Sequence, residues 1–131
     1  GLHTPAPYNE FALRVAQNKI DLLNFLKEAQ SQGKTLAAIG ASTKGNVLLQ
    51  YCGLTEDDIA YVGEVNSEKY GRYTPGTWIP IVPEEDVLGG KYDYLLILPW
   101  HFRKFFTSNP KLMTETLLFP LPHLETRESH K

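Results

Sequence analysis

The segment with the most distinctive chemistry is a short turn bounded by glycines, Gly40-Ala-Ser-Thr-Lys-Gly45, which leads into Asn46. Backbone N–H groups at the start of a helix attract anions, and the helix dipole adds to this attraction. Ser42 and Thr43 add hydroxyl groups, and Lys44 adds a positive charge. We therefore expect these residues to hold a phosphate group with side chains as well as backbone.

The spacing of the turn separates this site from better-known glycine motifs. Gly40 and Gly45 have the outer spacing of the dinucleotide fingerprint G-x-G-x-x-G, but Ser42 replaces the middle glycine, which normally lets the backbone approach a pyrophosphate. Asn46 stands where a Walker A loop needs lysine. A nucleophile elbow would need glycine at Lys44.

Two further groups lie at the end of the strand predicted over residues 59–65 and in the loop after it. Glu64 lies at the position where a dinucleotide fold places the acid that binds ribose, although a solvated carboxylate at a strand end fits the pattern too. Lys69, Arg72 and Tyr73 lie in the loop that follows, which would face the same crevice as the glycine turn. Either a binding loop or a solvated loop is compatible with this composition.

Trp100 and His101 follow the most apolar strand of the sequence. Trp100 could stack on a base or a sugar, and His101 could donate to a phosphate. Alternatively, Trp100 covers the core and His101 caps a helix.

Nothing in the spacing of histidine, cysteine and acidic residues predicts a metal site or a nucleophilic catalytic set, so we predict no catalytic residue.

The elements that must position these residues alternate between helix and strand. A long helix is predicted over residues 9–32, with Asn9 as its N-cap and Gly33 as its stop. Its wide apolar face predicts packing either on a sheet alone or also on a neighbouring domain. The other predictions are strands at 35–39, 59–65, 79–82 and 94–98, helices at 46–52, 83–86 and 102–106, and an extended edge or non-strand segment at 117–124. This alternation predicts an α/β fold with a mostly parallel sheet.

Length and charge limit what the chain can be. Its 131 residues are enough for one domain, and a net charge of -2 gives no reason to expect a nucleic-acid or membrane partner. A single cysteine, Cys52, excludes an internal disulfide and favours a cytoplasmic location. The first residue is not methionine, so we expect either processing or a piece of a longer protein.

A series of motifs resembles one family. The segments that carry the resemblance are Gly40 to Asn46, Leu48-Leu-Gln-Tyr-Cys-Gly53, Lys69-Tyr-Gly-Arg-Tyr-Thr-Pro-Gly-Thr77, and Tyr94 to Trp100 with His101-Phe102. Together they resemble the C-terminal domain of bacterial sugar C-methyltransferases, which use S-adenosylmethionine to methylate a nucleotide-linked deoxysugar. The resemblance runs from about residue 8 to residue 124.

The resemblance implies a Rossmann-like, three-layer domain with a mostly parallel sheet and the long N-terminal helix. Residues 1–8 would be a leader, 9–124 the domain and 125–131 a disordered tail. In this family a zinc-binding domain and a central domain that holds S-adenosylmethionine come first, and the C-terminal domain helps to bind the nucleotide-diphosphate sugar. This chain would then bind no cofactor and would be inactive without those partner domains.

Within that resemblance, each candidate residue has an expected role. The phosphate would contact Ser42, Thr43, Lys44 and the backbone of Gly45, with Lys69, Arg72 and Tyr73 as second choices. Glu64 and Trp100 would contact the sugar or the base. Two alternatives stay open, namely a stand-alone NAD(P)-type dinucleotide-binding module and a structural or dimerisation domain with a vestigial pocket.

Overall fold

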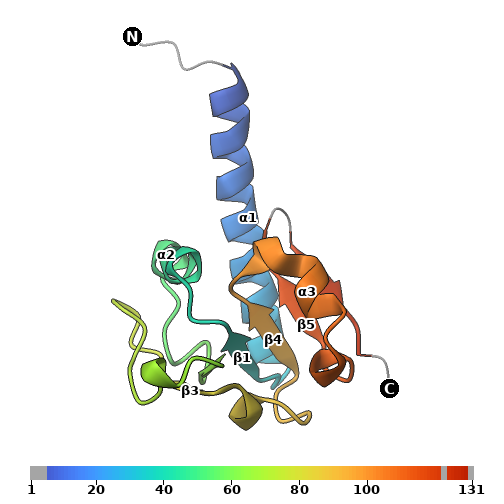
Figure 1. Cartoon of the computed structure of the whole chain (residues 1–131). Coiled ribbons are helices and arrows are strands. Elements are labelled where there is room, and N and C mark those ends of the chain that lie inside the picture. The colour runs from blue at the N-terminus through green and yellow to red at the C-terminus, as the bar shows by residue number, and fades with distance from the viewer. Residues whose placement is uncertain (1–5, 122–123, 130–131) are drawn as a thin grey trace.

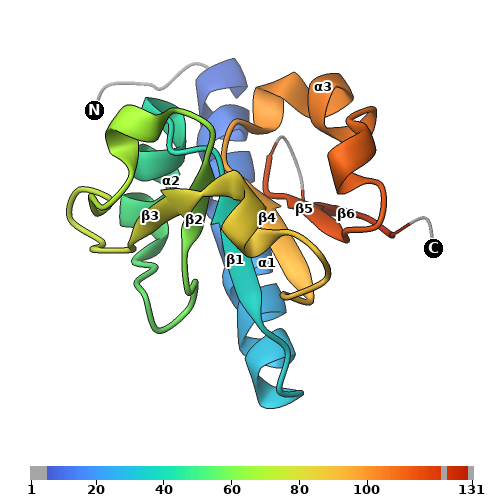
Figure 2. The same cartoon turned by 60° about the horizontal axis from the view of Figure 1, so that its bottom comes forward.

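The chain folds around one six-stranded sheet in the order β3-β2-β1-β4-β5-β6, which Figure 2 shows from one side to the other. The computed structural model describes residues 6–121 and 124–129, with side chains from residue 16 onward. The strands are β1 Leu36–Ile39, β2 Val62–Glu64, β3 Ile81–Pro83, β4 Tyr94–Ile97, β5 Leu117–Phe119 and β6 Glu125–Arg127. Neighbouring strands are parallel except β5 and β6, which are antiparallel. The predicted α/β, Rossmann-like fold with a mostly parallel sheet is confirmed.

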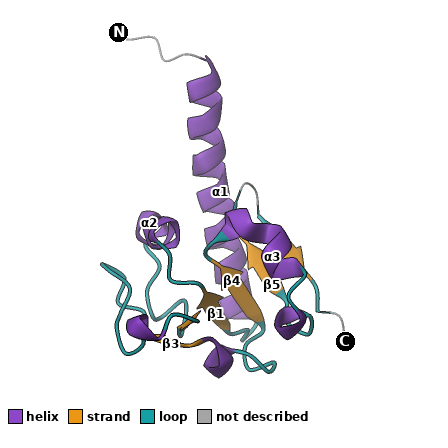
Figure 3. Ribbon diagram, in the orientation of Figure 1, coloured by secondary structure: helices purple, strands orange, loops and turns teal. Residues whose placement is uncertain are grey.

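Helices and single helical turns connect the strands (Figures 1 and 3). The α-helices are α1 Ala6–Ser31, α2 Thr43–Cys52 and α3 Arg103–Thr107. The 3₁₀ turns are η1 Ser67–Lys69, η2 Glu84–Val87, η3 Trp100–Phe102 and η4 Pro110–Leu112. No helix in the described part of the chain is long and apolar enough to cross a membrane.

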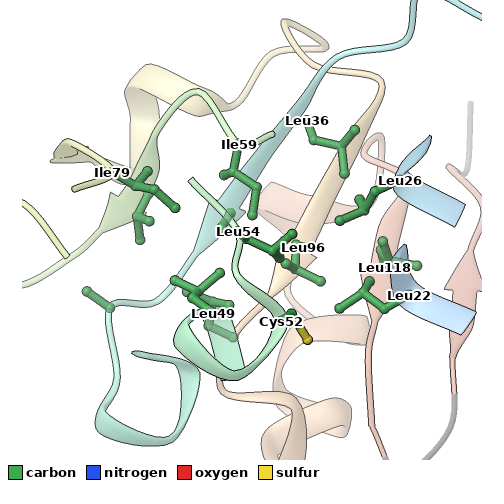
Figure 4. Packing of buried hydrophobic residues seen from close by; sticks show 14 of the residues in the cluster. Leu22, Leu26, Leu36, Leu49, Cys52, Leu54, Ile59, Ile79, Leu96 and Leu118 are labelled. Carbon is green, nitrogen blue, oxygen red and sulfur yellow. The ribbon is translucent and has the colours of Figure 1, made fainter. Parts of the chain in front are cut away.

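Residues of the central strands alternate between two hydrophobic cores, one on each face of the sheet. Leu36 and Ala38 of β1 belong to the core beneath α1 and α2, whereas Ala37 and Ile39 belong to the core beneath α3 and the short turns. Figure 4 shows the first of these cores. Because parallel strands buried on both faces need cover on both sides, the domain has three layers.

The second half of α1 packs on the sheet, and its middle does not. Leu22, Leu26 and Ala29 are buried at helical spacing, whereas Ala16 is exposed and Ile20 is 51% exposed. In Figure 1 the first half of the helix extends away from the sheet. The side chains of residues 6–15 of this helix lie outside the described residues.

Two sequence predictions about where helices begin need correction. The first helix begins at Ala6, so Asn9 is inside it and is not its N-cap. Pro7 is compatible with this start because a proline in the first turn lacks only an N–H that would have no intrahelical acceptor. The second helix begins at Thr43 and not at Asn46, because Ser42 caps it. Residues 1–5 of the predicted leader lie outside the described residues.

The end of the chain also differs from the prediction. Leu117–Phe119 is an interior strand, because β6 pairs with it on its outer side. Glu125–Arg127 of the predicted disordered tail is therefore part of the sheet, and Arg127 donates to the carbonyl oxygens of Thr107 and Glu115 at 3.2 and 3.1 Å. Arg103 also forms a 2.9 Å salt bridge with Glu125. Hydrophobic pattern did not reveal this strand, because its residues are polar and its hydrogen bonds come from the backbone. Residues 130–131 lie outside the described residues.

Leu49 of α2 tests the packing of this helix on the sheet. It is fully buried, whereas Val47, two residues earlier, is 60% exposed. We expect Leu49→Ala to lower the free energy of unfolding by about 2–5 kcal/mol, because it opens a cavity in the core. Val47→Ala is the matched control and should change it by less than about 0.5 kcal/mol. Denaturant unfolding measures both, and equal effects of the two substitutions would contradict the structure.

Candidate functional site

A crevice with a volume of about 640 Å³ opens at the carboxyl ends of β1, β2 and β4. It lies where the strand order reverses, since β2 and β3 follow β1 on one side and β4 to β6 lie on the other. Open α/β sheets bind ligands at this position, and the volume is within the range of small-molecule sites. The lining includes Gly40, Ser42 and Glu64 from the candidate residues.

The two glycines of the turn are required by packing. Gly40 has a φ of +86°, and a Cβ atom there would lie 2.5 Å from Cγ of Pro99. A Cβ atom on Gly45 would lie 2.6 Å from Cβ of Leu98. The spacing of the glycines therefore lets β1 turn sharply and lets α2 approach β4 closely, which are two of the three roles of glycine in the dinucleotide fingerprint.

Ser42 begins α2. Its Oγ accepts a hydrogen bond of 3.0 Å from the backbone N–H of Gly45, so part of its hydrogen-bonding capacity is used as an N-cap. Thr43 and Lys44 follow in the first turn with exposed side chains, and their N–H groups have no acceptor within the helix. Asn46 Oδ1 is buried and has no hydrogen-bond partner among the described residues.

Glu64 is an internal anion of the site. It is 7% exposed, and its Oε1 accepts from Ala41 N–H at 3.0 Å. Its Oε2 accepts from the N–H groups of Val65 and Asn66 at 2.8 and 2.9 Å. The Glu64 carboxylate therefore already binds the N–H group of Ala41. Without it, that N–H group at the start of the glycine turn could bind an external anion.

Lys69 completes this cluster from the loop after β2. Its Nζ donates to the carbonyl oxygen of Ala41 at 2.6 Å and lies 3.8 Å from Glu64 Oε1. Arg72 and Tyr73, further along the same loop, have exposed side chains. The structure thus joins Lys69 to the glycine turn. Arg72 and Tyr73 do not line the crevice, because they pair with Ile81 and Pro80 at the start of β3. Their predicted contacts with a phosphate stay predictions.

Trp100 and His101 do not line the crevice. Trp100 is partly buried and packs against the core on the α3 face, while His101 is exposed in η3. Their predicted contacts with a base and a phosphate stay predictions.

No group of three or more histidine, cysteine, aspartate or glutamate side chains in the described part of the chain is arranged to hold a metal ion.

Several lining residues were missed by the sequence analysis. Phe102, Phe105 and Phe106 form an apolar wall, and Glu84 and Lys111 supply charges from η2 and η4. The apolar spacing of residues 102–106 predicts a helix, but exposure of two of its three phenylalanines cannot be read from the sequence. Glu84 and Lys111 are far from every motif, and only the fold brings them to the crevice.

Comparison with known proteins identifies the family. A family model described as the C-methyltransferase C-terminal domain matches residues 1–122. The chain belongs to this family. It is also 32% identical over 125 residues to the C-methyltransferase NovU of Streptomyces niveus, an alignment that covers 93% of the chain and 30% of NovU. The predicted resemblance is confirmed at this level, and the chain spans about a third of the length of that relative.

The glycine turn of this C-methyltransferase domain does not fit a nucleoside cofactor such as S-adenosylmethionine or NAD(P). Such a cofactor needs a close approach to the turn and an acid free to bind its ribose. Ser42 carries a side chain at the position of closest approach, and Glu64 is used by Ala41, Val65 and Asn66. We therefore derive no methyl-transfer step from the turn.

Glu84 is the crevice residue with a shifted pKa. Partial burial raises the pKa of its carboxyl above the ordinary 4.5, the positive charge of Lys111 opposes this shift, and the negative charge of Glu64 adds to it. An acid whose pKa is raised by folding costs stability when it is ionised. The cost is present above the raised pKa and disappears as the pH falls to 4.5.

Glu64→Ala tests the internal anion. It leaves three backbone N–H groups without their acceptor and removes the carboxylate that pairs with Lys69, so we expect the free energy of unfolding to fall by about 3 kcal/mol. Glu68→Ala removes an exposed carboxylate from the neighbouring turn and should cost less than about 0.5 kcal/mol. Chemical denaturation measures both. A cost for Glu64→Ala no larger than that of the control would show that these hydrogen bonds do not hold the turn.

Glu84→Gln tests the sign of the pKa shift. Because the ionised carboxylate is disfavoured, we expect the substitution to stabilise the domain at pH 7 by less than about 1 kcal/mol, a size limited by solvent screening. The gain should vanish at pH values below 4.5. Urea unfolding across this pH range measures it, with Glu85→Gln on the same turn as control. A loss of stability at pH 7 would contradict the predicted sign.

Proposed function

We propose that this domain binds the nucleotide-sugar substrate of an S-adenosylmethionine-dependent sugar C-methyltransferase and holds its diphosphate. The supporting observation is that the first turn of α2 presents Thr43 and Lys44, with free N–H groups, directly beside the crevice that Ser42 lines. Membership of the C-methyltransferase C-terminal domain family supplies the reaction class. A helix start, a lysine and an adjacent cavity suit a phosphorylated ligand.

The roles of the candidate residues differ in this proposal. Thr43 and Lys44 contact the diphosphate, whereas Arg72 and Tyr73 lie beside the start of β3 and have no contact with it in this proposal. Glu64 and Lys69 act indirectly, because their groups already hold the backbone around Ala41. Fixing the turn before the ligand arrives reduces the ordering that binding would otherwise require.

The rest of the reaction belongs to other parts of a longer protein. We propose that S-adenosylmethionine, a zinc-binding domain and the catalytic groups lie outside this chain, which is then inactive by itself. The matching share of NovU, 30%, leaves room for such parts in that relative. Held at its diphosphate, the sugar would be positioned for attack by binding energy remote from the reacting carbon.

Neither alternative fits the site as well. A stand-alone NAD(P)-binding module needs an acid that is free to bind ribose, and Glu64 is committed to the turn. A purely structural domain with a vestigial pocket predicts no ligand binding in the crevice beside Lys44. The test below also separates this last alternative from substrate binding.

Lys44→Ala in the chain is expected to weaken binding of a thymidine diphosphate sugar by about 10- to 100-fold, because it removes a charged hydrogen-bond donor to phosphate. Isothermal titration calorimetry measures the affinity, and amide chemical shifts of residues 40–46 report the location. Lys34→Ala removes the same charge at the other end of β1 and should have no effect. Equal affinities for the two variants and the original chain would refute diphosphate binding at α2.

A further inference from the structure

Helix α1 carries two stripes of apolar residues, and only one of them packs on the sheet. The stripe that begins at Leu22 is buried. Ala16, Ile20 and Leu23 have the spacing i, i+4 and i+7, which places them along another side of the helix. Ala16 is exposed, Ile20 is 51% exposed, and Leu23 is partly buried at the margin of the core. An apolar stripe left in water predicts a second packing surface.

Helix α2 adds to this apolar surface. Val47 and Tyr51 lie one turn apart on α2 and are 60% and 47% exposed. Lys19, which precedes Ile20 on α1, places its Nζ 4.6 Å from the centroid of the Tyr51 ring, so the two helices meet beside the second stripe. We name the exposed residues Ala16, Ile20, Val47 and Tyr51 the α1–α2 face. Exposed apolar residues gathered in one place on a soluble domain mark an interaction site.

The part of α1 before this face has no sheet beneath it. From Ala16 back to Ala6 the helix extends away from the rest of the domain (Figure 1). The sequence of this part is apolar at Phe11, Leu13 and Val15 among other positions. Because helices gain most of their stability by packing an apolar side, a projecting helix of this composition suits a second body that packs along it.

The comparisons favour one partner for this surface. The matching family model is that of a C-terminal domain, and 70% of NovU lies outside its alignment with the chain, which covers the other 30%. Since α1 is the first element of the domain, a preceding domain would join it at the projecting end. A partner on the same chain has a high effective concentration, so a modest apolar face is enough to hold it. A second copy of the chain would bear the full entropic cost of association.

We propose that the α1–α2 face is the docking surface for the domain that precedes this one in the full-length protein, and that an apolar patch of that domain covers Ile20, Val47 and Tyr51. The proposal rests on the proposed function only where that function places further domains outside this chain. It requires no bound ligand. Docking here fixes the preceding domain along the projecting half of α1.

The test compares the chain with the natural protein that continues before residue 1. Hydroxyl-radical labelling of the Tyr51 side chain, followed by mass spectrometry, measures how accessible the ring is. We expect labelling to be at least about fivefold slower in the longer protein, because docking buries a ring that is 47% exposed in the chain alone. Equal rates in the two proteins, or a natural protein without a preceding domain, would overturn the proposal.

Variants assign the protection to the α1–α2 face. Ile20→Glu in the longer protein should return the labelling of Tyr51 to its rate in the chain alone, because docking would bury an unpaired carboxylate. Val47→Glu should do the same from the other helix. The matched control is Tyr61→Glu, which introduces the same charge at a residue 40% exposed just before β2, and it should leave Tyr51 protected. Persistent protection in both face variants, or an equal loss in the control, would overturn the proposal.

Two further measurements separate the alternatives. Sedimentation of the chain alone should show a monomer, whereas a dimer that Ile20→Glu dissociates would assign the face to a second copy and overturn the proposal. Calorimetry with the diphosphate sugar tests the proposed function independently. Protected Tyr51 without diphosphate binding would leave the docking surface standing and the proposed function refuted. Diphosphate binding with unprotected Tyr51 would overturn the docking surface alone.

Discussion

The site depends on a carboxylate that the protein supplies to itself. Glu64, at the end of β2, accepts hydrogen bonds from Ala41 after β1 and from Val65 and Asn66 after its own strand. Lys69 joins the same two groups, because it pairs with Glu64 and donates to the carbonyl oxygen of Ala41. The ends of two neighbouring strands are thereby joined before any ligand binds. The same carboxylate already uses the N–H group of Ala41, so the proposed phosphate site is left with the free N–H groups of Thr43 and Lys44.

Much of the fold could be predicted because it depends on local pattern and on simple sheet rules. β1 and β4 lie within the apolar runs that predict them, and Gly53 ends α2 with a φ of +66°, as a helix stop does. The errors come from hydrogen bonds that hydrophobicity does not report. Helix α2 begins at Thr43, earlier than predicted, because Ser42 caps it. The polar residues 125–127 belong to the sheet because their backbone pairs with Leu117–Phe119.

The site was harder to predict, because its residues come from segments far apart in the sequence. A motif drew attention to Gly40 and Gly45, and the structure explains them by contacts with Pro99 and Leu98. Spacing also drew attention to Glu64, but only the fold shows which groups its oxygens meet. The aromatic wall and the pair of charges on η2 and η4 carry no local signal, since the turn after β3 and the segment after α3 converge only when the sheet forms.

The direction of α1 places the first half of this helix, which extends away from the sheet, at the same edge as the crevice. Only four residues, 32–35, separate the end of α1 from β1, so the two elements run in opposite directions. The start of α1 therefore extends past the same edge of the sheet at which β1 ends and the crevice opens (Figure 1). A surface held by the first half of α1 would face this edge, where the proposed function places the nucleotide-sugar. This arrangement suits the proposed function, in which a second domain would complete the site from the side that this domain leaves open.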